Sequence, residues 1–380
     1  MSPLALSFVN AEVLLPEGFV CQPLSMADGF IDEASKGRQI DLTGYQILPG
    51  IVDLHGDGFE RHLAPRRGAV KDLQTGFYAL HSELASNGIT TAVLAQFYSW
   101  EGGMRGPGFA HEFLAHLEQF GPKVPSTLLP QLRFETHMLD HYTEFAALCA
   151  RYGVPYVVFN DHLPHQALAK GKRPARLTGQ ALKSGRSPEA HLELLKELHE
   201  KSDRVAAALP NLIAALGAGV LLGSHDDARA QDRQGWAAKG AALCEFPETK
   251  EAAEAAAALG NPVIMGAPNV VRGGSHKKNI SALELIQQGL CSALASDYHY
   301  PSPRLAALAL AREIGLPAAW HLVSSGPAAI FGLKDRGHIK AGYRADLVIL
   351  EAQSQQVAAC FAGGALSYMS GDLAQRFFGS

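Results

Sequence analysis

The stretch GIVDLHGDGFERHLAPR, residues 50–66, decides the fold, because an apolar β-type run ends there at His55 and Asp57. Side chains at i and i+2 of a strand point to the same side. A neutral imidazole and a carboxylate at that spacing can bind one divalent metal ion. The alternative is a strand end whose His and Asp make only hydrogen bonds. The rest of the chain bears on this choice.

Apolar runs of the same kind recur after residue 50 and alternate with amphipathic, helix-like segments. The runs cover residues 50–55, 88–97, 128–138, 154–162, 220–227, 261–269 and 291–299, and the helix-like segments include residues 72–88, 143–153 and 187–209. Repeated β-then-α alternation favours a parallel sheet with right-handed crossovers. It predicts an α/β fold, most simply a (β/α)8 barrel of the TIM type.

The two ends of the chain have a different pattern from the middle. Residues 1–49 contain short strands and turns, and a β pattern returns near the C-terminus, in residues 337–350 and 356–371. Two flanking β segments pair most economically with each other. We therefore expect a small, discontinuous β-sandwich domain built from residues 1–49 and 335–380, beside a barrel of residues 50–334.

Composition limits the class of protein. Among 380 residues, 47% are hydrophobic and 18% charged, which allows a large core and argues against disorder. The formal net charge of −4 argues against a nucleic-acid partner. We see no signal peptide and no uninterrupted apolar run of membrane-spanning length, so no membrane partner is expected. Five dispersed cysteines suggest reduced thiols and a cytoplasmic location. The oligomeric state stays open, with a homodimer as one option.

The His55 pattern recurs at four other predicted strand ends. An apolar run stops in each case at one or more His, Asp or Glu residues: Glu135 and His137, Asp161 and His162, His225 with Asp226 and Asp227, and Asp297 with His299. The carboxyl ends of barrel strands form the face where barrel enzymes keep their chemistry. Burying so many ionisable groups there is costly unless they are paired or bound to metal.

These residues predict two divalent metal ions. His55 and Asp57 would hold one ion, His162 and His225 the other, and Glu135 would bridge them. Asp297 would contact a metal and take a proton from the attacking water, as the catalytic residue. Two close cations lower the pKa of a shared water and neutralise substrate charge. Zinc is the expected metal, although the same donors accept manganese or iron.

A second motif, MGAPNVVRGGSHKKN at residues 265–279, follows another predicted strand. Glycines let backbone amides turn towards an anion, and an arginine fork suits phosphate oxygens. The alternative is a flexible glycine turn with a solvated basic end. We expect phosphate binding by Arg272, Gly273, Gly274, Ser275, His276 and Lys277. Arg61 and His62, close to the first metal motif, are expected to add positive charge, their alternative being a solvated loop.

On these motifs the sequence resembles the amidohydrolase superfamily. The strand-one His-x-Asp, the late strand ending in Asp297, and the closing segment DRGHIKAGYRADLVIL, residues 335–350, carry that likeness. Within the superfamily, LPGIVDLHGDGFERHLAPR, GSHDDA, MGAPNVVRGGSH and ASDY resemble the phosphonate-metabolism hydrolases of the carbon–phosphorus lyase pathway, the α-D-ribose 1-methylphosphonate 5-triphosphate diphosphatases. The resemblance runs from about residue 48 to residue 350.

The resemblance implies hydrolysis of a small phosphorylated substrate, a sugar triphosphate, to the 5-phosphate and pyrophosphate. It also implies the metal positions proposed above. The chain departs from the family pattern at Leu163, His165, Lys277, Lys278 and His299, which leaves the exact substrate open. Two alternatives remain: amide or cyclic-amide hydrolysis or deamination on the same metal scaffold, and a metal-stabilised binding or scaffold protein without turnover.

Overall fold

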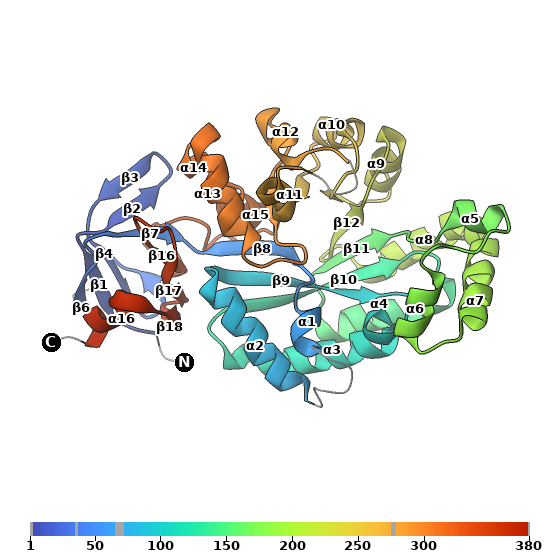
Figure 1. The fold of residues 1–380 in the computed structure, drawn as a ribbon, viewed down its shortest axis with the longest axis horizontal. Coiled ribbons are helices and arrows are strands. Elements are labelled where there is room, and N and C mark those ends of the chain that lie inside the picture. Colours follow the sequence, from blue (N-terminus) through green and yellow to red (C-terminus); the bar gives the residue numbers. More distant parts are fainter. Residues whose placement is uncertain (1–2, 35–36, 65–71, 275–278, 379–380) are drawn as a thin grey trace. The chain divides into compact units, whose positions relative to one another are not determined.

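The structure, a computed structural model, describes residues 3–34, 37–64, 72–274 and 279–378. Its central element is a sheet of eight parallel strands that follow one another in chain order, with helices between them (Figure 1). The strands are β8 (Ile51–Gly56), β9 (Ile89–Tyr98), β10 (Thr127–Glu135), β11 (Tyr156–Asn160), β12 (Leu221–His225), β13 (Leu243–Glu245), β14 (Val263–Gly266) and β15 (Ala293–Ala295).

The first and last of these strands are adjacent, so the sheet curves round into a barrel. Gly56, at the end of β8, forms a parallel bridge with Asp297, just after β15. The predicted (β/α)8 barrel is therefore confirmed. All ten residues of β9 are buried, as expected for a parallel strand covered on both faces.

Helices connect and cover the strands. They are α1 (Glu60–Leu63), α2 (Leu73–Ser86), α3 (Pro107–Phe120), α4 (Tyr142–Tyr152), α5 (His165–Ala169), α6 (Leu177–Ser184), α7 (Pro188–Glu200), α8 (Ser202–Leu216), α9 (Ala230–Ala237), α10 (Lys250–Ala258), α11 (Ala267–Arg272), α12 (Ala282–Gln287), α13 (Ser302–Ile314), α14 (Leu316–His321), α15 (Ser325–Ile330) and α16 (Gly371–Phe378), with 3-10 turns η1 (Gly103–Arg105), η2 (Gly121–Lys123) and η3 (Leu139–His141). None of the helices in these described ranges is long and apolar enough to cross a membrane.

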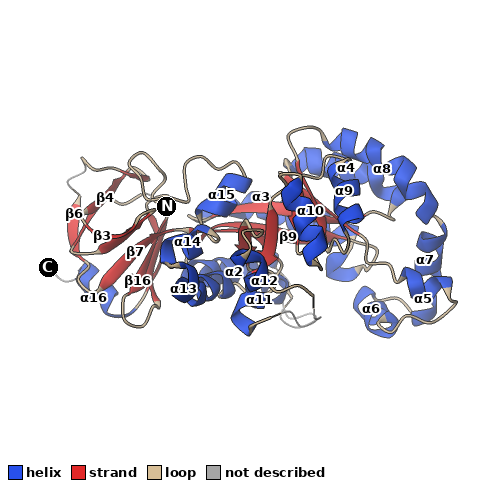
Figure 2. Ribbon diagram, turned by 90° about the horizontal axis from the view of Figure 1, so that it is seen from above, coloured by secondary structure: helices blue, strands red, loops and turns tan. Residues whose placement is uncertain are grey.

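Local chemistry explains several helix boundaries. The Asp72 carboxylate caps α2 by accepting a hydrogen bond from the Gln74 amide, and Ser187 caps α7 through the Ala190 amide. The segment predicted as one helix over residues 187–209 instead belongs to two helices. The helical conformation is interrupted at Lys201, between α7 and α8. The second of them lies beside α4 (Figure 2).

Strands from both chain ends form two further sheets, as predicted. They are β1 (Leu6–Val9), β2 (Glu12–Leu15), β3 (Gly18–Cys21), β4 (Leu24–Ala27), β5 (Phe30–Ile31), β6 (Arg38–Asp41), β7 (Tyr45–Pro49), β16 (Leu347–Glu351), β17 (Val357–Ala362) and β18 (Ala365–Met369), in the orders β5-β4-β1-β6 and β18-β17-β16-β7-β2-β3. One hydrophobic core joins both sheets, with Phe8 and Met26 from the first and Ile47, Leu347 and Phe361 from the second. In Figure 1 the blue N-terminal strands lie beside the red C-terminal ones.

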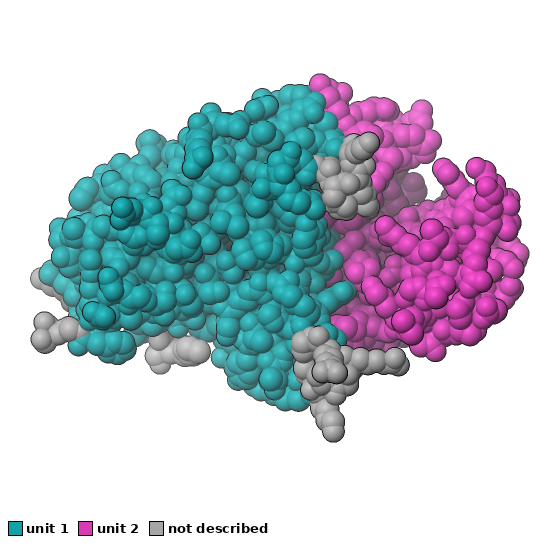
Figure 3. Space-filling view, in the orientation of Figure 1, with its two compact units in different colours: residues 1–94, 119–129, 262–380 teal, residues 95–118, 130–261 magenta. Residues whose placement is uncertain are grey.

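The chain divides into two compact units (Figure 3). The first contains residues 1–94, 119–129 and 262–380, and the second contains residues 95–118 and 130–261. Each unit supplies strands to the barrel. The domain boundaries expected at residues 49/50 and 334/335 stay a prediction.

Candidate active site

In the first unit, three predicted metal ligands lie together at the carboxyl ends of β8 and β15. His55, Asp57 and Asp297 each offer one ligand atom, and these atoms lie within 4.8 Å of one another. Backbone hydrogen bonds hold the strand ends in this arrangement: the Asp57 amide donates to the Asp297 carbonyl, and the Asp297 amide to the His55 carbonyl, both at 2.9 Å. An imidazole and two carboxylates suit a divalent metal ion.

Asp53, two residues before His55, makes hydrogen bonds that help to position this group. Its fully buried carboxylate accepts hydrogen bonds from the Ser296 amide (2.9 Å) and the Ser296 hydroxyl (2.6 Å). Burial raises the pKa of Asp53 and outweighs these hydrogen bonds, which act in the opposite direction. Asp53 thus ties the residue before Asp297 to the first barrel strand. The sequence prediction passed over it, although it shares the i, i+2 spacing with His55.

Gly56 separates His55 and Asp57 and leaves no room for a side chain. A Cβ atom at this position would lie 2.6 Å from the Tyr300 ring and 2.9 Å from both the Asp53 carboxylate and the Ser296 hydroxyl. Because the Asp53–Ser296 contact and Tyr300 are buried, they cannot move aside without disturbing the packing. The sequence His-Gly-Asp is therefore a steric requirement of this strand end.

Two of the strand-end aspartates have an unusual backbone. Asp297 has φ 55° and Asp226 has φ 60°, in the left-handed region that costs most residues about 1 kcal/mol or more. Aspartate tolerates this region better than most residues. Such conformations occur often at active sites, where the surrounding structure holds them in place.

In the second unit, His162, His225 and Asp226 form a corresponding group. One ligand atom of each lies within 4.8 Å of the others. Asp226 lies between the two imidazoles, with its carboxylate 3.2 Å from His225 Nδ1 and 3.9 Å from His162 Nε2. Arg133 donates a hydrogen bond to His225 Nε2 at 3.1 Å. An ion bound to His225 would replace one of these two contacts.

Glu135, the predicted bridging ligand, ends β10 and is fully buried. Its carboxylate accepts a hydrogen bond from the His162 amide (3.1 Å), contacts His162 Nδ1 (2.5 Å) and accepts from Trp100 Nε1 (3.2 Å). Burial alone would raise the pKa of Glu135, but the charge and hydrogen bonds of His162 outweigh it and lower the pKa. Glu135 is thus an ionised carboxylate held against a predicted ligand.

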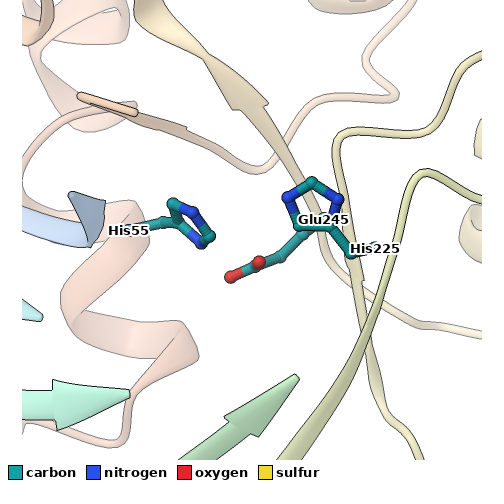
Figure 4. Close-up of side chains that lie close together, drawn as sticks. All are labelled: His55, His225 and Glu245. Carbon is teal, nitrogen blue, oxygen red and sulfur yellow. The ribbon is translucent and has the colours of Figure 1, made fainter. Parts of the chain in front are cut away.

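The strand that sequence analysis missed, β13, contributes a further buried carboxylate. Glu245 pairs with His225 across the β12–β13 register, and the two offer ligand atoms within 4.8 Å. Figure 4 shows the His225 ring beside the Glu245 side chain, with His55 of the first unit drawn in the same view. Glu245 accepts hydrogen bonds from the Tyr156 hydroxyl (2.6 Å) and Gln131 Nε2 (2.8 Å). The sequence gives little indication of Glu245 as a site residue, because β13 has only three residues.

The predicted phosphate-binding residues fall into two places. Arg61, on α1, forms an ion pair with Glu83 of α2 and donates a hydrogen bond to the Tyr298 carbonyl, and the His62 ring contacts the same Glu83 carboxylate. Their predicted role in phosphate binding stays a prediction. Arg272 ends α11, and Gly273 and Gly274 follow it with φ of 76° and 148°. Ser275, His276 and Lys277, together with the departure at Lys278, lie outside the described residues.

Comparison with known proteins agrees with this fold. A model of the amidohydrolase family matches residues 281–360. A crystal structure of an amidohydrolase superposes with TM-score 0.66 at 13% identity, covering 97% of this chain and 100% of that one. A β-aspartyl dipeptidase from Fervidobacterium islandicum AW-1 gives TM-score 0.61 at 13% identity, covering 98% and 99%. At these identities the likeness concerns the fold alone, which is the fold of an amidohydrolase.

A curated protein shows a likeness in sequence as well. The α-D-ribose 1-methylphosphonate 5-triphosphate diphosphatase of Escherichia coli (strain K12) is 31% identical over 376 residues, covering 92% of this chain and 96% of that protein. This chain therefore belongs to the amidohydrolase superfamily, in the family of that diphosphatase. The resemblance inferred from the sequence motifs is confirmed.

Proposed function

We propose that this protein hydrolyses α-D-ribose 1-methylphosphonate 5-triphosphate, or a closely related phosphorylated sugar, to the 5-phosphate and pyrophosphate. The likeness to the diphosphatase over 92% of the chain carries this proposal. The strand-end groups support it, since they contain the imidazoles and carboxylates that metal-assisted hydrolysis uses.

Two divalent ions, zinc in the first instance, are proposed as cofactors. His55, Asp57 and Asp297 would hold one ion in the first unit, and His162 and His225, with Asp226 beside them, the other in the second unit. The mixed nitrogen and oxygen donors fit zinc and also manganese or iron. When bound, such ions lower the pKa of water and neutralise charge on phosphate oxygens. The bridging role of Glu135 is proposed on the same basis.

The residues of the chain have separate tasks in this proposal. Asp297 is proposed to accept the proton of the attacking water, since its carboxylate lies beside His55 and Asp57 at the strand end. Asp53 positions Asp297 through Ser296. Arg272, Gly273 and Gly274, with Ser275, His276 and Lys277, bind the phosphate chain. Arg61 and His62, both in contact with Glu83, are proposed to take part in phosphate binding as well.

The cytoplasm is the proposed compartment, and a homodimer is the oligomeric state to be tested. All five cysteines are free thiols, and Cys149, Cys244 and Cys360 are buried. Free thiols are typical of proteins in reducing compartments.

A product assay tests the proposed activity against its alternative. Zinc-loaded protein is incubated separately with the ribosyl triphosphate, with a nucleoside triphosphate and with a cyclic amide, and products are identified by phosphorus NMR and by ammonia or carboxylate release. We expect pyrophosphate from the ribosyl triphosphate at the highest kcat/KM. Turnover of the amide with no pyrophosphate from either triphosphate would favour amide hydrolysis instead.

A further inference from the structure

A second cluster of metal-ligating side chains lies in the second unit, apart from the ligands assigned above. His137, Asp161 and His165 each offer one ligand atom, and these atoms lie within 4.8 Å of one another. His137 follows β10, Asp161 follows β11, and His165 begins α5. Three elements therefore bring two imidazoles and one carboxylate to a single point.

The distances fit a single ion. His165 Nε2 lies 3.0 Å from each oxygen of the Asp161 carboxylate, and His137 Nδ1 lies 3.5 Å from Asp161 Oδ1. Around a tetrahedral zinc ion with bonds of about 2.1 Å, ligand atoms are about 3.4 Å apart. The two separations from Asp161 lie on either side of that value, and the His137 and His165 ligand atoms lie within 4.8 Å of each other, so the three atoms are close enough to share an ion after side-chain adjustment.

A fourth residue, His199 of α7, orients the cluster. Its Nδ1 lies 2.8 Å from Nδ1 of His165. When Nε2 of His165 is bound to a metal ion, the ring proton lies on Nδ1, from which it can be donated to His199. Metal-bound histidines commonly make such a hydrogen bond with the other ring nitrogen, which fixes the tautomer and the ring plane. His199 is thus a positioning residue.

The cluster is accessible to ions from solvent. The side chain of His137 is 6% exposed, whereas those of His165 and Asp161 are 32% and 43% exposed. His137 and Asp161 also line a cavity of about 600 Å³, together with His162, His225 and Asp226. Three protein ligands leave a coordination position open, as in zinc sites that bind water or substrate.

We propose that His137, Asp161 and His165 form an additional site for a divalent transition metal ion, with His199 as its positioning residue. This site is separate from the two ions of the proposed hydrolytic reaction. Its ligands are nitrogen, nitrogen and oxygen, which suits zinc, cobalt or nickel rather than magnesium or calcium.

Zinc titration of chelator-stripped protein tests the proposal. The His165→Gln variant is expected to bind one zinc ion fewer than the wild type. The control is His111→Gln, which replaces an exposed histidine that pairs with Glu144 and should leave the number of bound zinc ions unchanged. The His199→Ala variant keeps the number of ions but binds this one about 10–100-fold more weakly. Circular dichroism of the metal-free proteins checks that all variants fold. Because the readout is a difference of one ion, it does not depend on the hydrolytic activity.

A replacement of the ligand type gives a spectroscopic test. Cobalt(II)-loaded His165→Cys protein is expected to show a thiolate-to-cobalt charge-transfer band in the near ultraviolet that the cobalt-loaded wild type does not show. If residue 165 does not bind the metal ion, the introduced cysteine will produce no such band. Equal zinc stoichiometry and affinity for His165→Gln and wild type, together with no new band in His165→Cys, would overturn the proposal.

Discussion

At the scale of single residues, the strand end His55-Gly56-Asp57 is the most constrained part of the proposed site. Its two ligands lie beside Asp297, and its glycine lies against Tyr300 and the Asp53–Ser296 hydrogen bonds. Any side chain at position 56 must displace one of these groups. The position of the ligands and the packing of the barrel mouth are therefore coupled.

We expect Gly56→Ala to lower bound metal and activity together. The added methyl group would push apart the Asp53–Ser296 contact that holds Asp297, and overpacking of this kind costs about 1–3 kcal/mol of stability. Metal analysis, kcat and urea denaturation measure the three effects. Gly108→Ala is the matched control, because a Cβ atom there meets nothing within 4 Å. Unchanged metal content in Gly56→Ala would refute the steric argument.

Asp297→Asn is expected to separate catalysis from folding. The amide keeps the shape of the carboxylate but cannot accept the proton of the attacking water, so kcat should fall about 10²–10⁴-fold. Asp140→Asn, at a carboxylate with 79% of its side chain exposed, should leave kcat unchanged. If Asp297→Asn retained more than a tenth of wild-type kcat, Asp297 would not be the proton acceptor.

The residues proposed as metal ligands stand out in the sequence because each follows an apolar run, whereas the contacts of the residues proposed to bind phosphate do not. His55, Asp57 and Asp297 do lie together as expected. Glu83, which pairs with Arg61 and His62, is on a helix face indistinguishable from a solvated one. Residue spacing alone does not show which side chain of a helix will pair with a distant arginine or histidine.

At the scale of elements, strand length decided what the sequence could predict. Long, β-branched strands such as β9 were evident, but β13 comprises only Leu243–Glu245, between a turn and a loop. A run of three residues is too short for a periodic pattern. For that reason Glu245, which accepts hydrogen bonds from Tyr156 and Gln131, went unnoticed.

An ionic network around the buried Asp346, the residue before β16, reaches barrel residues of the same unit. Asp346 accepts hydrogen bonds from Arg344 Nε (2.8 Å) and the Gly363 amide (2.7 Å). Arg344 also donates to the Pro125 carbonyl, and Arg336 donates to Thr91 and Thr127. The network therefore contributes to the attachment of the sandwich to the barrel.

Asp346→Ala should lower the free energy of unfolding by about 3 kcal/mol, because it leaves the partly buried Arg344 guanidinium without its carboxylate and removes the acceptor of the Gly363 amide. Urea denaturation followed by circular dichroism measures the change. Asp335→Ala is the control: its carboxylate also pairs with Arg336 but is 48% exposed, so the expected loss is about 1 kcal/mol or less. Equal losses in both variants would contradict a structural role for Asp346.

At the scale of the whole molecule, the sequence predicted the architecture because barrel and sandwich have different patterns. Repeated βα alternation indicated the barrel, and the return of β pattern at the C-terminus indicated pairing with the N-terminal strands; both are found. The division into two compact units was not predicted, since the breaks at residues 94/95 and 261/262 fall inside or beside barrel elements that look continuous in sequence.

The most direct test of the central claim is the product stoichiometry of one protein sample in three states: stripped of metal, reloaded with zinc, and stripped again. With α-D-ribose 1-methylphosphonate 5-triphosphate as substrate, phosphorus NMR follows the triphosphate, the 5-phosphate and pyrophosphate. We predict one pyrophosphate for each 5-phosphate in the reloaded state, and no turnover in either stripped state. An intact triphosphate in the zinc-loaded sample, or pyrophosphate release that persists without metal, would contradict the account.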